Sequence, residues 1–234
     1  MIVVIIDPMK LMFTPSETDI IDATRDVAWE YAAMLAAVLE MVKGHKGPTN
    51  HQAQEVFLVH VRSLAEFFTQ RVEDFKSALK ISPPPPFPIF PRERRLDNIY
   101  AVDFCSDVLW DWRVFKDKKL ITAINKTLSH MSYARTSGVD PFDGKKHAHG
   151  TVMLLCSAWD GFLKSLRPEF RKPLLNGLQE HTRAGDCYGL RPLNDFGHQF
   201  EKMIKHGGWR LNETPDGPVP SVAYPPHFPY FDAT

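Results

Sequence analysis

The amino-acid sequence predicts an all-α protein, a helical bundle of four or five main helices with a proline-rich linker and an extended C-terminal tail. Apolar residues recur every three or four positions over long stretches, which is the period of one helix face. Glycine and proline stand between these stretches, where helices end. The 234 residues suffice for one large domain. We expect a single helical-bundle domain over 1–206 and an extended tail over 207–234.

Two long amphipathic helices are predicted first. The helix expected over 17–43 carries one apolar stripe, formed by Ile20, Val27, Tyr31, Leu35, Val38 and Val42. The helix expected over about 50–72 has Asn50 as its N-cap and an apolar face of Phe57, His60, Val61, Leu64 and Phe68. Residues 73–80 either extend this helix or follow it. These apolar faces are expected to pack against each other as in a bundle.

A proline-rich segment then interrupts the helical pattern. Proline fixes φ and removes a hydrogen-bond donor, so about 81–96 is predicted to be an extended insertion. Two interpretations of Pro83–Pro91 stay open, a stiff connector and a segment that docks in a partner's aromatic groove. Residues 97–112 are rich in aromatic and acidic side chains. We expect short helical turns there, whose aromatic rings close one end of the core.

The second half of the chain predicts further helices. One is expected over about 116–134, with an apolar stripe of Leu120, Ile124, Leu128 and Met131. After a loop over 136–146, a helix is expected over about 149–166, and another begins at Pro168 with Phe170, Leu174 and Leu178 facing inward. A last helix is expected over 193–206. The tail over 207–234 is rich in aromatic residues, which disordered tails usually lack, so we expect it to pack on the surface or on a partner. These residues are Trp209, Tyr224, Phe228, Tyr230 and Phe231.

Charge and cysteine content narrow the function classes. Lys+Arg and Asp+Glu both number 28, which argues against a globally basic nucleic-acid-binding protein. The three cysteines are far apart and form no CxxC pair, as is typical of reduced thiols in a cytoplasmic protein. No stretch reaches the roughly 18 apolar residues of a membrane span. We therefore expect a cytoplasmic protein without a cofactor and without a membrane partner.

Two pairs of polar residues are candidates for catalysis, His60 with Arg62 and Asn125 with His130. In a shared groove, histidine could move a proton on a phosphodiester and arginine could stabilise the phosphate charge. Another interpretation is that His60 is a hydrogen-bonded core histidine, because it lies inside an apolar stripe. Asn125 and His130 are five positions apart, which is roughly 140° on a helix. They would serve different contacts or meet other groups across a dimer.

The segment from Asn125 to His130 resembles the polar-residue-x4-His core of the HEPN helical-bundle superfamily, where the first position is normally arginine. Many HEPN proteins are ribonucleases of toxin–antitoxin and phage-defence systems, and they typically dimerise to build the site. The resemblance implies a metal-independent ribonuclease or RNA-binding protein with Asn125 and His130 at its site, and we expect Arg62 to act with them as a catalytic residue. This chain departs from the motif by having asparagine at its first position.

A narrower resemblance concerns uncharacterised bacterial proteins with a His-x-Arg-x-Leu segment followed by Ile-Asn-Lys-x3-His. The matching segments are His60-Val61-Arg62-Ser63-Leu64 and Ile124-Asn125-Lys126 with His130, and together they cover about 50–136. No function follows from this second likeness.

Two alternatives remain beside the ribonuclease hypothesis. His147 and His149 form an HxH pair near Asp140 and Asp143, which could hold a transition metal, although a polar helix start explains the pair as well. The whole protein could also be a non-catalytic helical scaffold or interaction module. In either case a homodimer, or a protein partner bound through the 207–234 tail, is expected.

Overall fold

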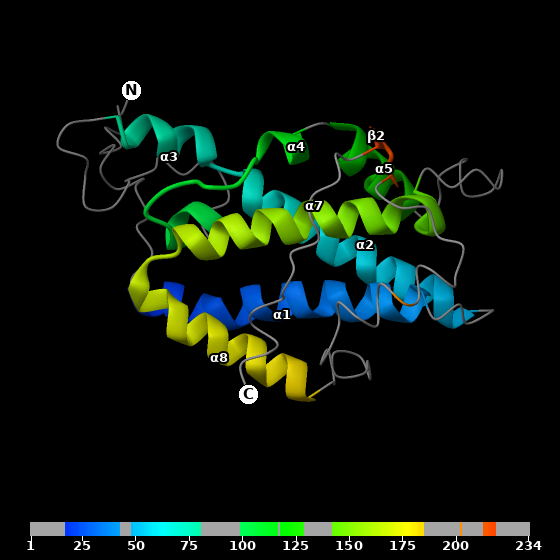
Figure 1. Cartoon of the computed structure of the whole chain (residues 1–234), viewed down its shortest axis with the longest axis horizontal. Coiled ribbons are helices and arrows are strands. Elements are labelled where there is room, and N and C mark those ends of the chain that lie inside the picture. Colours follow the sequence, from blue (N-terminus) through cyan, green and yellow to red (C-terminus); the bar gives the residue numbers. More distant parts are fainter. Residues whose placement is uncertain are drawn as a thin grey trace, which may run out of the picture.

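The computed structural model describes residues 17–42, 48–80, 99–116, 118–128, 142–184, 202 and 213–218. Long helices dominate this part of the chain and share one hydrophobic core (Figure 1), which confirms the all-α fold class. The helices are α1 (Glu17–Val42), α2 (Pro48–Thr69), α3 (Val72–Ala78), η2 (Ala101–Phe104), α4 (Arg113–Lys116), α5 (Lys118–Leu128), α7 (Gly144–Ser165) and α8 (Pro168–Ala184). None of the described helices combines the length and the hydropathy needed to cross a membrane.

Helix α1 is the central rod of the bundle. It contacts α2, α7 and α8, and Figure 1 shows it between α7 and α8. Residues 31–39 are buried without a break, so this part of α1 has neighbours all round rather than along the single stripe that the sequence predicted. Small side chains allow the close approach: a Cβ on Gly177 of α8 would lie 3.0 Å from the Cβ of Ala28.

Helix α2 begins earlier and ends earlier than predicted. It starts at Pro48, so Asn50 lies inside the first turn and is not the N-cap. Proline suits the first turn because its fixed φ is already helical and its missing N–H has no partner there. The helix ends at Thr69, and Arg71 takes a left-handed conformation (φ 63°) before α3 begins. Residues 72–78 therefore follow α2 as a separate short helix.

Aromatic rings close one end of the core, as predicted for residues 97–112. Phe104, Trp110 and Trp112 are buried, and the short helix η2 lies among them. The indole N–H of Trp110 donates a hydrogen bond of 2.9 Å to the carbonyl of Phe68. The ring of Phe162 on α7 contacts both Phe68 and Phe104 edge-on. The prediction of short turns packed against the bundle is confirmed.

The later helices match the predictions in type but differ at their boundaries. Helix α5 lies within the helix predicted over about 116–134, α4 ends at Lys116, and residues 129–134 lie outside the described residues. Helix α7 starts at Gly144, so the last residues of the predicted 136–146 loop are helical. The Asp143 carboxylate accepts hydrogen bonds from the first-turn amides of Lys145 and Lys146, which fixes this start. In α8, Phe170, Leu174 and Leu178 are buried as predicted.

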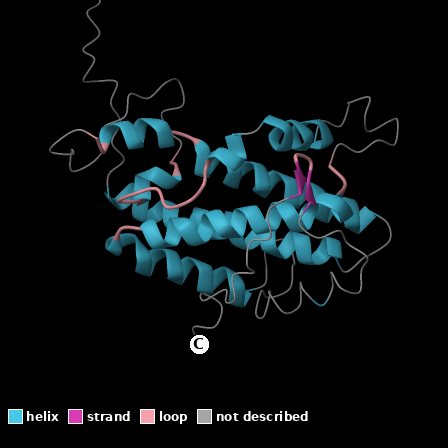
Figure 2. Cartoon of the chain, turned by 45° about the horizontal axis from the view of Figure 1, so that its top comes forward, coloured by secondary structure: helices cyan, strands magenta, loops and turns pink. Residues whose placement is uncertain are grey.

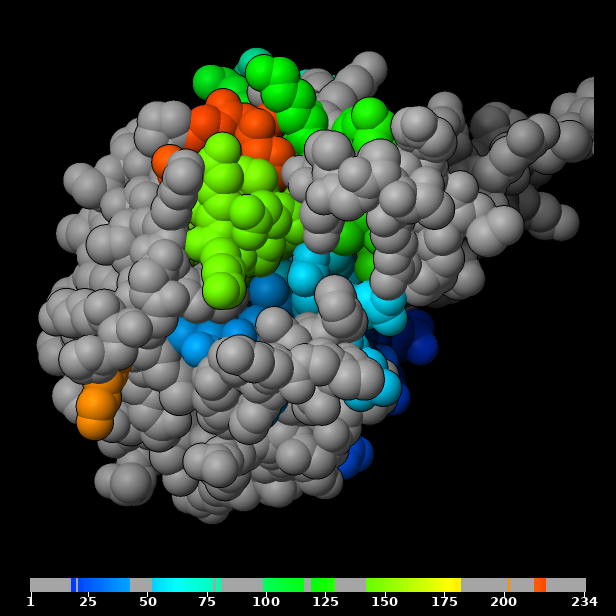
Figure 3. Space-filling model, turned by 90° about the vertical axis from the view of Figure 1, so that its right-hand side faces the viewer, coloured from blue at the N-terminus to red at the C-terminus, as the bar shows by residue number. Residues whose placement is uncertain are grey.

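Part of the predicted tail forms a small hairpin against α7. Strand β1 (Glu213–Thr214) pairs antiparallel with β2 (Gly217–Pro218), and β1 lies directly on α7 (Figures 2 and 3). A Cβ on Gly150 would come within 2.4 Å of the Glu213 carbonyl oxygen, so glycine is needed at this crossing. Residues 213–218 are the part of the predicted 207–234 tail that the structure describes. The 81–96 insertion, all of the predicted 193–206 helix except residue 202, and the tail outside 213–218 lie outside the described residues.

Candidate functional site

His60 lies in the core between α1 and α2. Its side chain is 3% exposed, and Nδ1 lies 2.7 Å from Oε2 of Glu30 on α1. The Trp29 ring packs edge-on against the imidazole, with the ring centroids 4.8 Å apart. This geometry matches the interpretation of His60 as a hydrogen-bonded core histidine. The Glu30 side chain is partly exposed, so its carboxylate contacts both the buried imidazole and solvent.

Arg62 points to a different side of α2. Two helical positions correspond to about 200°, so His60 and Arg62 cannot face the same groove. The Arg62 side chain is 47% exposed, and its Nε donates to Oε1 of Glu66 at 3.2 Å. Asn125 is exposed on α5, and His130 lies outside the described residues. The catalytic set of Arg62, Asn125 and His130 therefore stays a prediction.

The HxH pair is part of the buried surface of α7. His147 and His149 are 7% and 5% exposed, so both side chains are buried near the start of α7. Nδ1 of His147 accepts a hydrogen bond of 3.2 Å from the Asp143 amide, and burial lowers the pKa of His149. In the described part of the chain, no three His, Cys, Asp or Glu side chains are placed to hold a metal ion.

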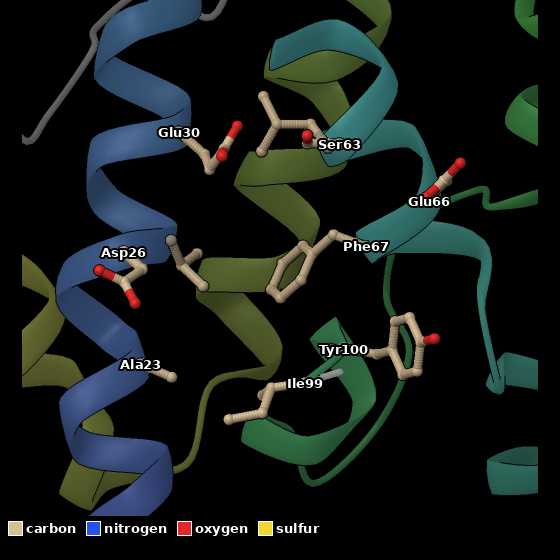
Figure 4. Close-up of a pocket in the computed structure, with 10 residues that line it drawn as sticks. Ala23, Asp26, Glu30, Ser63, Glu66, Phe67, Ile99 and Tyr100 are labelled. Carbon is tan, nitrogen blue, oxygen red and sulfur yellow. The ribbon is translucent and has the colours of Figure 1, made fainter. Parts of the chain in front are cut away.

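A concave surface lies beside the Glu30–His60 contact, between α1 and α2. We call it the α1–α2 groove, and its volume is about 340 Å³. Its apolar lining residues are Ala23, Val27, Leu64, Phe67 and Ile99, and its polar ones are Asp26, Glu30, Ser63, Glu66 and Tyr100. Figure 4 shows α1 and α2 as its two walls, with Phe67 pointing between them and Ile99 and Tyr100 at one end.

The charged side chains that line the α1–α2 groove are all acidic in the described part of the chain. Its lining includes the carboxylates of Asp26, Glu30 and Glu66, and none of the described residues that line it is basic. In Figure 4 the Glu30 carboxylate points across the groove toward Ser63, whereas that of Glu66 points away from α1. A negative surface above apolar and aromatic side chains suits a cation with an aliphatic stem, because the stem can cover apolar surface while the charge meets a carboxylate.

The sequence contains a signal for the acidic wall of this groove. Asp22, Asp26 and Glu30 are spaced four apart, so they form an acidic row beside the apolar stripe of α1. Like charges at this spacing destabilise a helix by about 0.2–0.5 kcal/mol per pair. Asp26 and Glu30 line the groove, whereas Asp22 is exposed outside it. The partner wall on α2, including Ser63 and Phe67, requires the packed structure.

Comparison with known proteins gives no relative from which a function could be transferred. No family model, curated protein or solved structure matches the chain.

Proposed function

We propose that this protein is a non-catalytic helical binding module whose α1–α2 groove takes a cationic group of a partner. The observation that carries the proposal is the presence of two groove carboxylates, Asp26 and Glu30, without a basic side chain among the described lining residues; the third carboxylate, Glu66, is paired with Arg62. The side chains of Leu64 and Phe67 provide apolar surface for a lysine or arginine stem. The groove volume lies within the range of small binding pockets, about 300–1,000 Å³.

The surroundings of Arg62 favour this proposal over phosphodiester cleavage. Arg62 is already paired with Glu66, and the adjoining groove carries two further carboxylates, Asp26 and Glu30. An RNA phosphate beside Arg62 would have to compete with the Glu66 carboxylate for the guanidinium. The buried imidazole of His60 faces Glu30 and is not exposed to a bound phosphate.

The affinity is expected to be moderate and sensitive to salt. A single exposed ion pair contributes about 0–1 kcal/mol, so several carboxylates and the apolar lining must act together. Screening over about 8 Å at physiological ionic strength weakens contacts to the exposed carboxylates. A cationic ligand should therefore bind more weakly at high salt, which separates this mode from purely apolar docking.

The test is binding of a fluorescent peptide with one arginine to the full chain, measured by anisotropy at low and high salt. The Asp26→Asn/Glu30→Gln variant removes two charges, and we expect its affinity to fall about tenfold, which corresponds to about 1.4 kcal/mol. Asp160→Asn on α7 is the matched control, because that carboxylate is exposed and lies outside the groove. Equal affinity of all three proteins would overturn the proposal.

The ribonuclease prediction is tested on the same samples. On the proposal above, the purified wild-type protein leaves RNA intact. Cleavage by the wild type that is lost in both Arg62→Ala and His130→Ala, with the helical circular dichroism spectrum retained, would replace the binding proposal with catalysis.

A further inference from the structure

A second concave surface lies on the other flank of α2. We call it the α2–α5 groove, and its volume is about 450 Å³. Its apolar lining includes Ala65, Trp112, Phe115 and Ile121, contributed by α2, α4, α5 and the chain before α4. Glu66 lines both this groove and the α1–α2 groove, so the two surfaces meet at one residue of α2. The outward direction of the Glu66 carboxylate in Figure 4 fits this shared position.

The α2–α5 groove repeats the chemistry of the first one. Glu66, Glu73 and Asp74 supply three carboxylates beside two aromatic rings. Among the described lining residues only Arg71 is basic. Its side chain is 10% exposed, and Nη1 lies 4.0 Å from Oδ1 of Asp103, which is 5% exposed. The positive charge of Arg71 thus faces a buried carboxylate, while the acidic side chains of α3 stay exposed.

The break between α2 and α3 brings these acidic side chains to the groove. Arg71 adopts φ 63°, a left-handed conformation that is uncommon and unfavourable for a residue other than glycine. The chain turns at this point, and α3 starts with Glu73 and Asp74 in its first turn. Without the turn, α2 would continue along its axis and these two residues would occupy other positions. A strained residue is thus maintained at the edge of a concave acidic surface.

We propose that the partner is an extended basic polypeptide segment that crosses α2 at Glu66 and places one cationic side chain in each groove. This inference rests on the proposed function. A helix with its side chains is about 10–12 Å wide, and an extended chain advances about 3.3 Å per residue. The two cationic residues of the partner are therefore about four positions apart.

Arginine fits both grooves better than a simple point charge does. Tyr100 is partly exposed in the first groove, where a guanidinium can stack on its ring while its N–H groups meet carboxylates. In the second groove Trp112 is buried, so the fork of N–H donors to the carboxylates favours arginine there. Carboxylates in both grooves repel a nucleic acid backbone. The charge pattern therefore favours a polypeptide with spaced arginines over RNA.

The experiment compares two peptides of about ten residues, one with two arginines four positions apart and one with the second arginine replaced by glutamine. Affinity for the full chain is measured by anisotropy. We expect the two-arginine peptide to bind at least about tenfold more tightly, because linking two contacts makes the second one intramolecular. The Glu73→Gln/Asp74→Asn variant should lose this advantage and keep its affinity for the one-arginine peptide. Asp111→Asn, an exposed carboxylate outside both grooves, is the control and should keep the advantage.

Three outcomes would overturn the inference: equal affinities of the two peptides for wild type, an advantage that survives in the Glu73→Gln/Asp74→Asn variant, or complete displacement of the two-arginine peptide by an equal concentration of spermine. These outcomes leave the proposed function intact as long as the one-arginine peptide still depends on Asp26 and Glu30. Loss of that dependence, by contrast, would remove the proposed function itself. Circular dichroism of each variant confirms that the helices are retained.

Discussion

The two halves of α1 serve different purposes. Residues 31–39 are buried on every side, whereas the half before them exposes Asp22, Arg25 and Asp26 and forms one wall of the α1–α2 groove. A helix that is apolar all round belongs in an interior, and one with an acidic row beside an apolar stripe can present a surface. The comparison teaches that one continuous helix supplies both the stability of the bundle and its candidate binding site. Changes in the two halves should therefore have separable effects.

The largest expected effect follows from truncation in the buried half. Leu35 has no exposed surface, so Leu35→Ala should lower the free energy of unfolding by about 2–5 kcal/mol through lost burial and the cavity that remains. Asp26→Asn in the exposed half should change it by no more than about 0.5 kcal/mol. Urea denaturation followed by circular dichroism measures both. Similar losses in the two variants would abolish the distinction between the halves.

A smaller effect is expected at the contact between the first half of α1 and α8. Gly177 has room for little more than its own hydrogen, because a Cβ there would lie 3.0 Å from the Ala28 Cβ and 3.4 Å from the Arg25 Cα. Gly177→Leu should cost about 1–3 kcal/mol by forcing the helices apart. Asn176→Leu, at the exposed neighbouring position of α8, is the control and should cost less than about 0.5 kcal/mol. Thermal denaturation that ranks the two variants in the opposite order would show that α1 and α8 pack loosely here.

The smallest effect concerns His149, which is buried on α7. Burial lowers the pKa of His149, so the folded state resists its protonation more than the unfolded chain does. Above the unfolded pKa of about 6.5, His149 is neutral in both states and protonation does not favour unfolding. As the pH falls below that value, the unfolded chain binds the proton more readily than the folded protein, so the free energy of unfolding decreases. Between pH 7 and pH 5, wild type should lose more stability than His149→Gln. Parallel pH profiles of the two proteins would show that His149 is solvated instead.

The sequence predicted those parts of the fold that depend on local periodicity. The stripes at Leu35, Phe57 and Leu174 identified three of the long helices, because buried apolar residues repeat at the helical period. The turn at Arg71 was not predictable, since nothing in its residue type favours a left-handed backbone. The complete burial of residues 31–39 was not predictable either, because it results from the packing of α2, α7 and α8 around α1.

The candidate site was predicted less well than the fold. His60 was recognised as a histidine inside an apolar stripe, but its bond to Glu30 joins residues 30 positions apart, and sequence periodicity does not report such contacts. The acidic row of Asp22, Asp26 and Glu30 was readable in the sequence. The groove beside this row forms only when α2 and Tyr100 pack next to α1, and the sequence does not report that packing. A site defined by the charge and shape of its surface carries no catalytic sequence motif.

The most direct test of the central claim is a nuclear magnetic resonance titration of the ¹⁵N-labelled full chain with the two-arginine peptide. If the α1–α2 groove is the binding surface, the amide resonances of residues 23–30, 63–67 and 99–100 shift together and saturate at one affinity, while those of 31–39 stay in place. Binding that leaves the groove resonances unchanged and shifts those around Asn125 instead would contradict the account.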